Sequence, residues 1–124
     1  MDYKATVVEA SRELTAREKI KFKDLSDAIP MDSAVTDDSD LIITPKAYAI
    51  VDVHNEKSDN KDYTKYVIEA ADGKLYTTGS ESFWKSFKDI WDEMAEEDEE
   101  WMLKVYKKDS ANYKGKKFIT CAIV

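Results

Sequence analysis

Hydrophobic and polar residues alternate along much of the chain, a pattern that predicts a protein built mainly from β-strands. In residues 41–55, one face of the expected strand carries only small or β-branched apolar residues, namely Ala47, Ala49, Val51 and Val53. The other segments with strand patterns are residues 3–14, 18–25, 63–71, 74–78, 101–107 and 118–124. We interpret this order as five or six main strands.

Turn and loop signals separate these strands. The strongest is Asp72-Gly73, because the tight turn that this pair favours needs a positive φ. Residues 56–62 are polar and predict a hairpin between the strand segments on either side of them. Residues 26–40 are acidic and show no period, which favours a surface loop. Residues 11–17 fit either a turn or a helix.

One segment has a helical period instead. Its large hydrophobic residues fall on one stripe at about 3.6 residues per turn, and they are Phe83, Trp84, Phe87, Ile90, Trp91 and Met94. Ser80 is a suitable N-cap, and Glu81 carries negative charge at the positive end of the helix. The helix is expected to end near Ala95, because residues 96–100 are all acidic and would lie at its negative end. We expect this helix to form much of the core.

Length and composition indicate one soluble domain covering residues 1–124. The chain is 43% hydrophobic and 36% charged, so it has enough apolar surface to fold but no stretch long enough to span a membrane. The N-terminal residues lack the basic and apolar regions of a secretion signal, and we expect a cytoplasmic protein without membrane contact. The single cysteine, Cys121, cannot form an internal disulfide and is expected to lie in the core.

Residues able to support catalysis are scarce, and we expect no enzyme activity, metal or cofactor. His54 is the only histidine, and it lacks the second histidine or cysteine that most metal sites need. The three glycines are scattered along the chain and form no phosphate-binding loop. The acidic cluster at residues 92–100 lacks the glycine and the alternating oxygen ligands of a calcium loop, which favours a solvated surface.

Charge is distributed unevenly along the C-terminal half. The net charge of the chain is −7, yet residues 101–124 hold six lysines against one aspartate, a net +5. Residues 80–100 hold nine carboxylates against two lysines, a net −7. Lysines interleaved with aromatic rings suit single-stranded nucleic acid, because cations follow the phosphates and rings stack on unpaired bases. The plainer interpretation is that the lysines only keep the strand faces soluble.

The candidate nucleic-acid contacts lie mainly in this basic C-terminal region. From that region we select Lys104, Tyr106, Lys108, Tyr113, Lys114, Lys116 and Phe118. From the strands before the helix we select Tyr48, Lys65 and Tyr76. The second group would contribute only if its strands adjoin the basic region.

Two local motifs give the C-terminal half a resemblance to a known family. The first is the turn sequence ahead of the helix, AADGKLY, and the second is a Lys-Gly loop followed by an aromatic residue in the closing segment, LKVYKKDSANYKGKKFITCAIV. Both resemble the single-stranded DNA-binding proteins of small tailed phages that replicate by protein priming in Gram-positive hosts. The resemblance implies cooperative, sequence-independent coating of displaced single strands. The contacts to which it points are Tyr76, Lys104, Tyr106, Lys114, Lys116 and Phe118.

The order of five strands with a helix between the third and fourth is that of the OB-fold. We therefore expect an α+β, mainly β protein, an OB-like antiparallel barrel of five to six strands with one amphipathic helix. The expected partner is single-stranded DNA. Replication proteins are expected to bind the acidic run formed by Glu96, Glu97, Asp98, Glu99 and Glu100.

Two other functions stay open at this point. An inhibitor or DNA mimic would present the acidic run and the acidic residues 32–40 to the nucleic-acid groove of another protein. The net charge of the chain favours this alternative, whereas the basic C-terminal region opposes it. A structural or assembly protein would place Trp84 or Trp101 at an oligomer interface.

Overall fold

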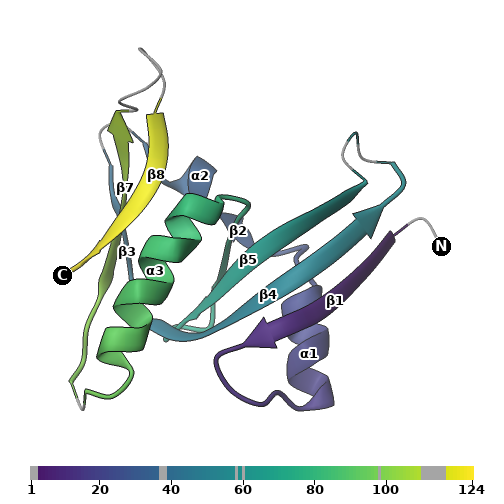
Figure 1. Ribbon diagram of the computed structural model, residues 1–124, viewed down its shortest axis with the longest axis horizontal. Coiled ribbons are helices and arrows are strands. Elements are labelled where there is room, and N and C mark those ends of the chain that lie inside the picture. The colour runs from purple at the N-terminus through teal and green to yellow at the C-terminus, as the bar shows by residue number, and fades with distance from the viewer. Residues whose placement is uncertain (1–2, 37–38, 58, 60, 98, 110–116) are drawn as a thin grey trace. The chain divides into compact units, whose positions relative to one another are not determined.

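The computed structural model describes residues 3–36, 39–57, 59, 61–97, 99–109 and 117–124 (Figure 1). Their helices and strands follow the order β1 (Tyr3–Ala10), α1 (Ala16–Lys23), β2 (Ile29–Pro30), α2 (Met31–Ala34), β3 (Leu41–Ile43), β4 (Pro45–Asn55), β5 (Asp62–Ala70), β6 (Leu75–Thr78), α3 (Glu81–Met94), β7 (Leu103–Asp109) and β8 (Lys117–Ile123). The chain divides into unit 1, Met1–Ile29 with Pro45–Gly79, and unit 2, Pro30–Thr44 with Ser80–Val124. Strands predominate over helices in the described residues, which confirms an α+β, mainly β protein.

Unit 1 is built on a sheet with the strand order β1-β4-β5-β6-β2, in which β1, β4, β5 and β6 pair antiparallel. The predicted apolar face of β4 is confirmed, because its four inward residues are at most 3% exposed, namely Ala47, Ala49, Val51 and Val53. The predicted turn between β5 and β6 is confirmed as well. Gly73 has a φ of 90°, and its N–H donates to the Ala70 carbonyl at 2.9 Å.

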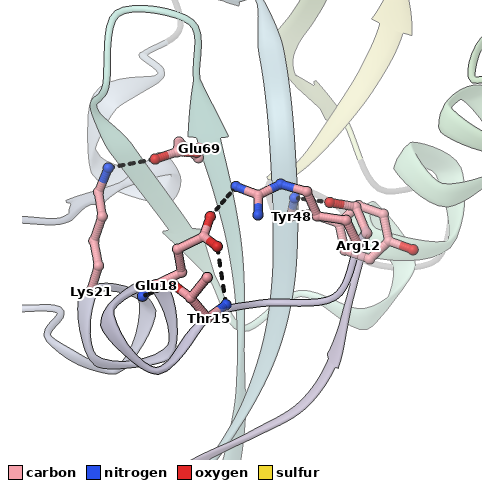
Figure 2. Close-up of polar contacts among 7 residues, drawn as sticks. Arg12, Thr15, Glu18, Lys21, Tyr48 and Glu69 are labelled. Carbon is pink, nitrogen blue, oxygen red and sulfur yellow. Dashed lines mark hydrogen bonds and ion pairs between the residues drawn. The ribbon is translucent and has the colours of Figure 1, made fainter.

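The alternation in residues 18–25 predicts a strand, and this prediction is wrong, because Ala16–Lys23 form helix α1. A capping box fixes the start of the helix. The Thr15 hydroxyl accepts from the Glu18 N–H at 3.2 Å, and the Glu18 carboxylate accepts from the Thr15 N–H at 3.0 Å. Arg12 also pairs with this carboxylate, and the contacts from Arg12 and Thr15 lower the pKa of Glu18 to about 2 (Figure 2).

The packing of α1 explains why the helix forms at this place. Phe22 is 1% exposed and lies in a cluster with Leu14 and the apolar face of β4, whereas Ile20 is 63% exposed. An ion pair adds a second attachment to the sheet, since Lys21 Nζ lies 2.5 Å from a carboxylate oxygen of Glu69 on β5 (Figure 2). Glu69 is itself buried, and a buried carboxylate is tolerated when it is paired in this way.

Unit 2 combines a sheet of order β3-β7-β8 with α3, which packs against β8 (Figure 1). The predicted helix is confirmed, because the Ser80 hydroxyl accepts from the Phe83 N–H at 3.2 Å and the helix ends at Met94 with Ala95 as its C-cap. The first half of the predicted stripe is buried, and the second half is only partly buried. The two sets are Phe83, Trp84 and Phe87, and then Ile90, Trp91 and Met94.

The acidic segment before β3 is more ordered than the surface loop that the sequence predicts. It contains α2, and its residues Met31 and Val35 are 0% and 1% exposed. They are four residues apart, so a single helical turn places both on the same side. The segment shows no period in the sequence because α2 has only four residues.

Barrel closure is absent from the strand pairs that the structure describes, which form two separate sheets. The described residues contain eight strands and three helices, rather than five or six strands and one helix. One reason is that residues 41–55 divide at Thr44 into β3 and β4, which pair in different sheets. In the described part of the chain, no helix has both the length and the apolar character to cross a bilayer.

The packing of α1 can be tested with two substitutions on the same helix. We expect Phe22→Ala to lower the free energy of unfolding by about 3–5 kcal/mol, because it leaves a cavity against β4. The exposed Ile20→Ala is the matched control and should change this free energy by less than about 0.5 kcal/mol. Urea unfolding followed by circular dichroism measures both, and similar losses in the two variants would contradict the helical packing.

The inward orientation of β8 can be tested through the single thiol. Cys121 lies opposite Val105, is 8% exposed, and has its pKa raised to about 12 by burial. Because the thiolate is the reactive form, we expect the folded protein to react with a disulfide reagent at pH 8 at least about a hundredfold more slowly than the unfolded protein. A fast reaction of the folded chain would mean that the other side of β8 faces the core.

Candidate nucleic-acid interface

One face of the β3-β7-β8 sheet combines lysines with aromatic rings. The pairing of β7 with β8 sets three residues of β7, Lys104, Tyr106 and Lys108, opposite Ala122, Thr120 and Phe118. The pairing of β3 with β7 sets Ile42 opposite Lys104. Because side chains alternate between the two faces of a sheet, all of these residues share one side. We call it the outer face, and its members are Ile42, Lys104, Tyr106, Lys108, Phe118, Thr120 and Ala122.

The opposite, inner face of the sheet is the buried one. Four of its residues on β7 and β8 are at most 8% exposed, namely Leu103, Val105, Ile119 and Cys121, whereas Lys107 is half-buried and Ile123, the last residue of β8, is 48% exposed. On the outer face, Phe118 is 40% exposed, Lys108 is exposed, and Lys104 and Tyr106 are half-buried. The buried inner residues therefore orient the lysines and rings of the outer face toward the surface.

Lys104 contacts both an aromatic ring and a carboxylate. Its ammonium nitrogen lies 5.4 Å from the centre of the Tyr106 ring, within the range of a cation–π interaction. The same nitrogen lies 3.4 Å from Oδ2 of Asp40, which directly precedes β3. Lys104 and Tyr106 are two residues apart on β7, so a strand rather than a loop fixes the spacing between charge and ring.

The chemistry of this face matches groups that every nucleotide carries. Lysine ammonium groups attract phosphates as point charges. Exposed aromatic rings stack on unpaired bases, whatever the base, because each base has a π-face. The arrangement is therefore suited to a flexible polyanion with accessible bases.

Three other candidate contacts lie in unit 1, with the two tyrosines on one side of its sheet and the lysine on the other. Tyr48 and Tyr76 both lie opposite Ile68 in the register of β4, β5 and β6, and they are only 5% and 7% exposed. Lys65 pairs with Val51, which places it on the other side of that sheet. Burial withdraws the two tyrosine rings from stacking, because their apolar surface contributes more to folding inside the protein.

Lys65 contacts a different aromatic ring, that of Tyr63, within unit 1. Its ammonium nitrogen lies 6.0 Å from the centre of the Tyr63 ring, two residues before it on β5. The remaining candidates, Tyr113, Lys114 and Lys116, lie outside the described residues.

Sequence reasoning missed the members of this site that precede β7 in the chain. Asp40 and Ile42 reach Lys104 through the pairing of β3 with β7, which connects distant parts of the chain. No local pattern predicts that pairing. Thr120 could have been found, because the alternation of β8 already places it on the same side as Phe118.

Unit 2 also carries acidic residues next to α3. Four of the five carboxylates of the acidic run are exposed, namely Glu96, Glu97, Glu99 and Glu100, and Asp98 lies outside the described residues. The Trp101 ring lies 6.1 Å from the Trp91 ring and is half-buried, whereas Trp84 is 5% exposed. An oligomer interface of the kind considered above would therefore have to use Trp101 rather than Trp84.

His54 lies at the β4–β5 hairpin of unit 1, between two carboxylates. Its Nδ1 is 2.7 Å from Asp62 and its Nε2 is 2.5 Å from Glu56. Hydrogen bonds to Asp62 and then to Glu56 raise the pKa of His54, so they favour its charged form. Within the described residues, no three His, Cys, Asp or Glu side chains are grouped so that they could hold a metal ion. The contacts of His54 are thus those of a surface ion-pair cluster.

Comparison of the sequence with known proteins identifies a family to which it is similar. The sequence profile of the family described as phage single-stranded DNA-binding protein matches residues 32–124. No curated protein and no solved structure matches the chain. The matched range begins within α2 and includes β3 to β8 and α3, so it contains the whole outer face. Three quarters of the sequence therefore fit that family, and the chain belongs to the phage single-stranded DNA-binding proteins.

Proposed function

We propose that this protein binds single-stranded DNA without sequence preference and without catalysis, through the outer face of the β3-β7-β8 sheet. The observation that carries the proposal is the placement of Lys104, Tyr106, Lys108 and Phe118 on one accessible side of that sheet. Membership in a family of single-stranded DNA-binding proteins supports the choice of ligand.

The two kinds of side chain divide the work of binding. Lys104 and Lys108 neutralise phosphates, and Tyr106 and Phe118 stack on bases at about 1–3 kcal/mol per base. Lys108 lies opposite Phe118 across the strands, so a charge and a ring are neighbours in the register there, whereas Lys104 contacts the Tyr106 ring of its own strand. Since neither group recognises a base edge, affinity is expected to depend on salt and strand length more than on sequence.

The negative net charge of the chain does not oppose this function, because the acidic and the basic residues are concentrated in different segments of the chain. The net charge is −7, but the positive side chains of the outer face are the ones that a strand would approach. The exposed carboxylates of Glu96, Glu97, Glu99 and Glu100 repel a nucleic acid. They are the surface we assign to replication proteins with basic docking sites, in the cytoplasm of the infected cell.

We also propose an OB-type fold for residues 1–124 as one domain, and the strand order from β3 to β8 supports the OB type. β3 and β4 are separated by Thr44 alone, and the first pairs with β7 while the second pairs with β5. Counted as one bent strand, they begin a series of five strands with α3 between the third and fourth, which is the order of the OB-fold. The family match from residue 32 onward includes all five.

The rival function is a DNA mimic, which the exposed acidic residues at 96–100 favour. Titration with poly-dT at two salt concentrations separates the two functions. A DNA-binding protein gives a salt-sensitive change in intrinsic Tyr or Trp emission, whereas a mimic gives none.

The stacking contacts can be tested by removing each ring. We expect Tyr106→Ala and Phe118→Ala each to weaken poly-dT binding by about 1–3 kcal/mol, because each loses one stacked base. Ile123→Ala is the matched control, since Ile123 is a comparably exposed residue of β8 on the other face, and it should leave affinity unchanged.

Circular dichroism and thermal unfolding should show that all three variants keep the fold. Fluorescence anisotropy of labelled poly-dT measures the affinities. If both ring variants bind like the parent protein, the outer face is not the binding surface.

A further inference from the structure

Asp40 lies beside the outer face, next to Lys104, the more enclosed of the two lysines on that face. It follows a short bridge in which the Thr36 N–H donates to the Ser39 carbonyl at 3.0 Å and the Ser39 N–H donates back at 3.4 Å. Directly after Asp40, β3 begins to pair with β7. Both flanks of Asp40 are therefore held by backbone hydrogen bonds, and its carboxylate reaches 3.4 Å from Lys104 Nζ.

This carboxylate takes one of the contacts that Lys104 could make with a phosphate. An ammonium group has three N–H donors, and that of Lys104 is already shared between the Tyr106 ring and Asp40. A phosphate oxygen and a carboxylate oxygen make the same kind of charge-assisted contact. Lys108 differs, because it is exposed and makes no ion pair with the residues that the structure describes.

We propose that Asp40 is an intramolecular competitor of the DNA backbone at Lys104. The free protein holds Lys104 as a neutral pair with Asp40, and a bound strand displaces the carboxylate with a phosphate. The competitor lowers the affinity and speeds release of the strand, and it lowers the net number of cations released on binding, because the displaced carboxylate attracts a cation in turn. This inference rests on the proposed function of the outer face.

The exposure of the pair limits the size of the effect. The side chains of Lys104 and Asp40 are 43% and 44% exposed, so water and salt screen their attraction. Pairs of this kind correspond to an effect of up to about fivefold on an equilibrium constant. Asp40 is therefore expected to tune binding rather than to prevent it.

The test compares Asp40→Asn with Glu93→Gln, which removes the same charge from an exposed residue of α3 in the same unit. We expect Asp40→Asn to tighten poly-dT binding by roughly two- to fivefold at low salt. It should also steepen the log–log salt dependence by at most about 0.7, the value for one neutralised phosphate. Glu93→Gln should change the affinity and the salt dependence only slightly, by the general effect of removing one negative charge.

A double-mutant cycle with Lys104→Ala identifies the mechanism. In the Lys104→Ala background, the gain from Asp40→Asn should fall to the level of Glu93→Gln, because no ammonium remains to be released. An equal gain in both backgrounds would overturn the competition and leave only general repulsion. No gain in the parent background would overturn it as well.

The same series distinguishes failure of this inference from failure of the proposed function. If Tyr106→Ala and Phe118→Ala weaken binding but Asp40→Asn has no effect, the outer face binds DNA and the competition is wrong. If neither the ring variants nor Lys104→Ala weaken binding, both proposals are wrong. Circular dichroism of each variant checks that the sheet is intact.

Discussion

Antiparallel pairing of β7 with β8 is the constraint on which the other features of the site depend. The register that buries Val105 against Cys121 also places Tyr106 beside Thr120 on the outer face, because successive side chains point to opposite sides. A shift of the register by one residue would turn the lysines toward the core and the core residues toward solvent, which would destabilise the fold. The stability of the sheet and the composition of its outer face are therefore set by one pattern.

The site also shows how a strongly acidic protein can present a surface for a polyanion. Charges act over about 8–10 Å at physiological salt, so a strand on the outer face interacts with Lys104 and Lys108 more than with any charge beyond that range. Within that range Asp40 is the carboxylate that contacts Lys104. Affinity is then decided by a few neighbouring groups rather than by the net charge of −7.

Local signals predicted some elements well and others poorly. The helix at residues 81–94 was predictable because its period lies within the segment, and its Ser80 cap and the acidic residues after it directly adjoin the segment. Residues 18–25 were not, because the i, i+2 spacing of Ile20 and Phe22 is typical of a strand, whereas in the helix these two residues lie on different faces. The Thr15 and Glu18 capping box was a local signal in favour of the helix. The need to cover β4 with Phe22 was not visible in the sequence.

The sequence by itself determined the class of the protein, the faces of the closing strands, the turn at Gly73 and the uneven distribution of charge. These properties depend on residues that are neighbours in the chain. Only the tertiary structure decided that Asp40 and Ile42 join Lys104, and that the Tyr48 and Tyr76 rings are buried. Such contacts require strands from distant parts of the chain to pair, and local patterns of polarity do not specify which strands do so.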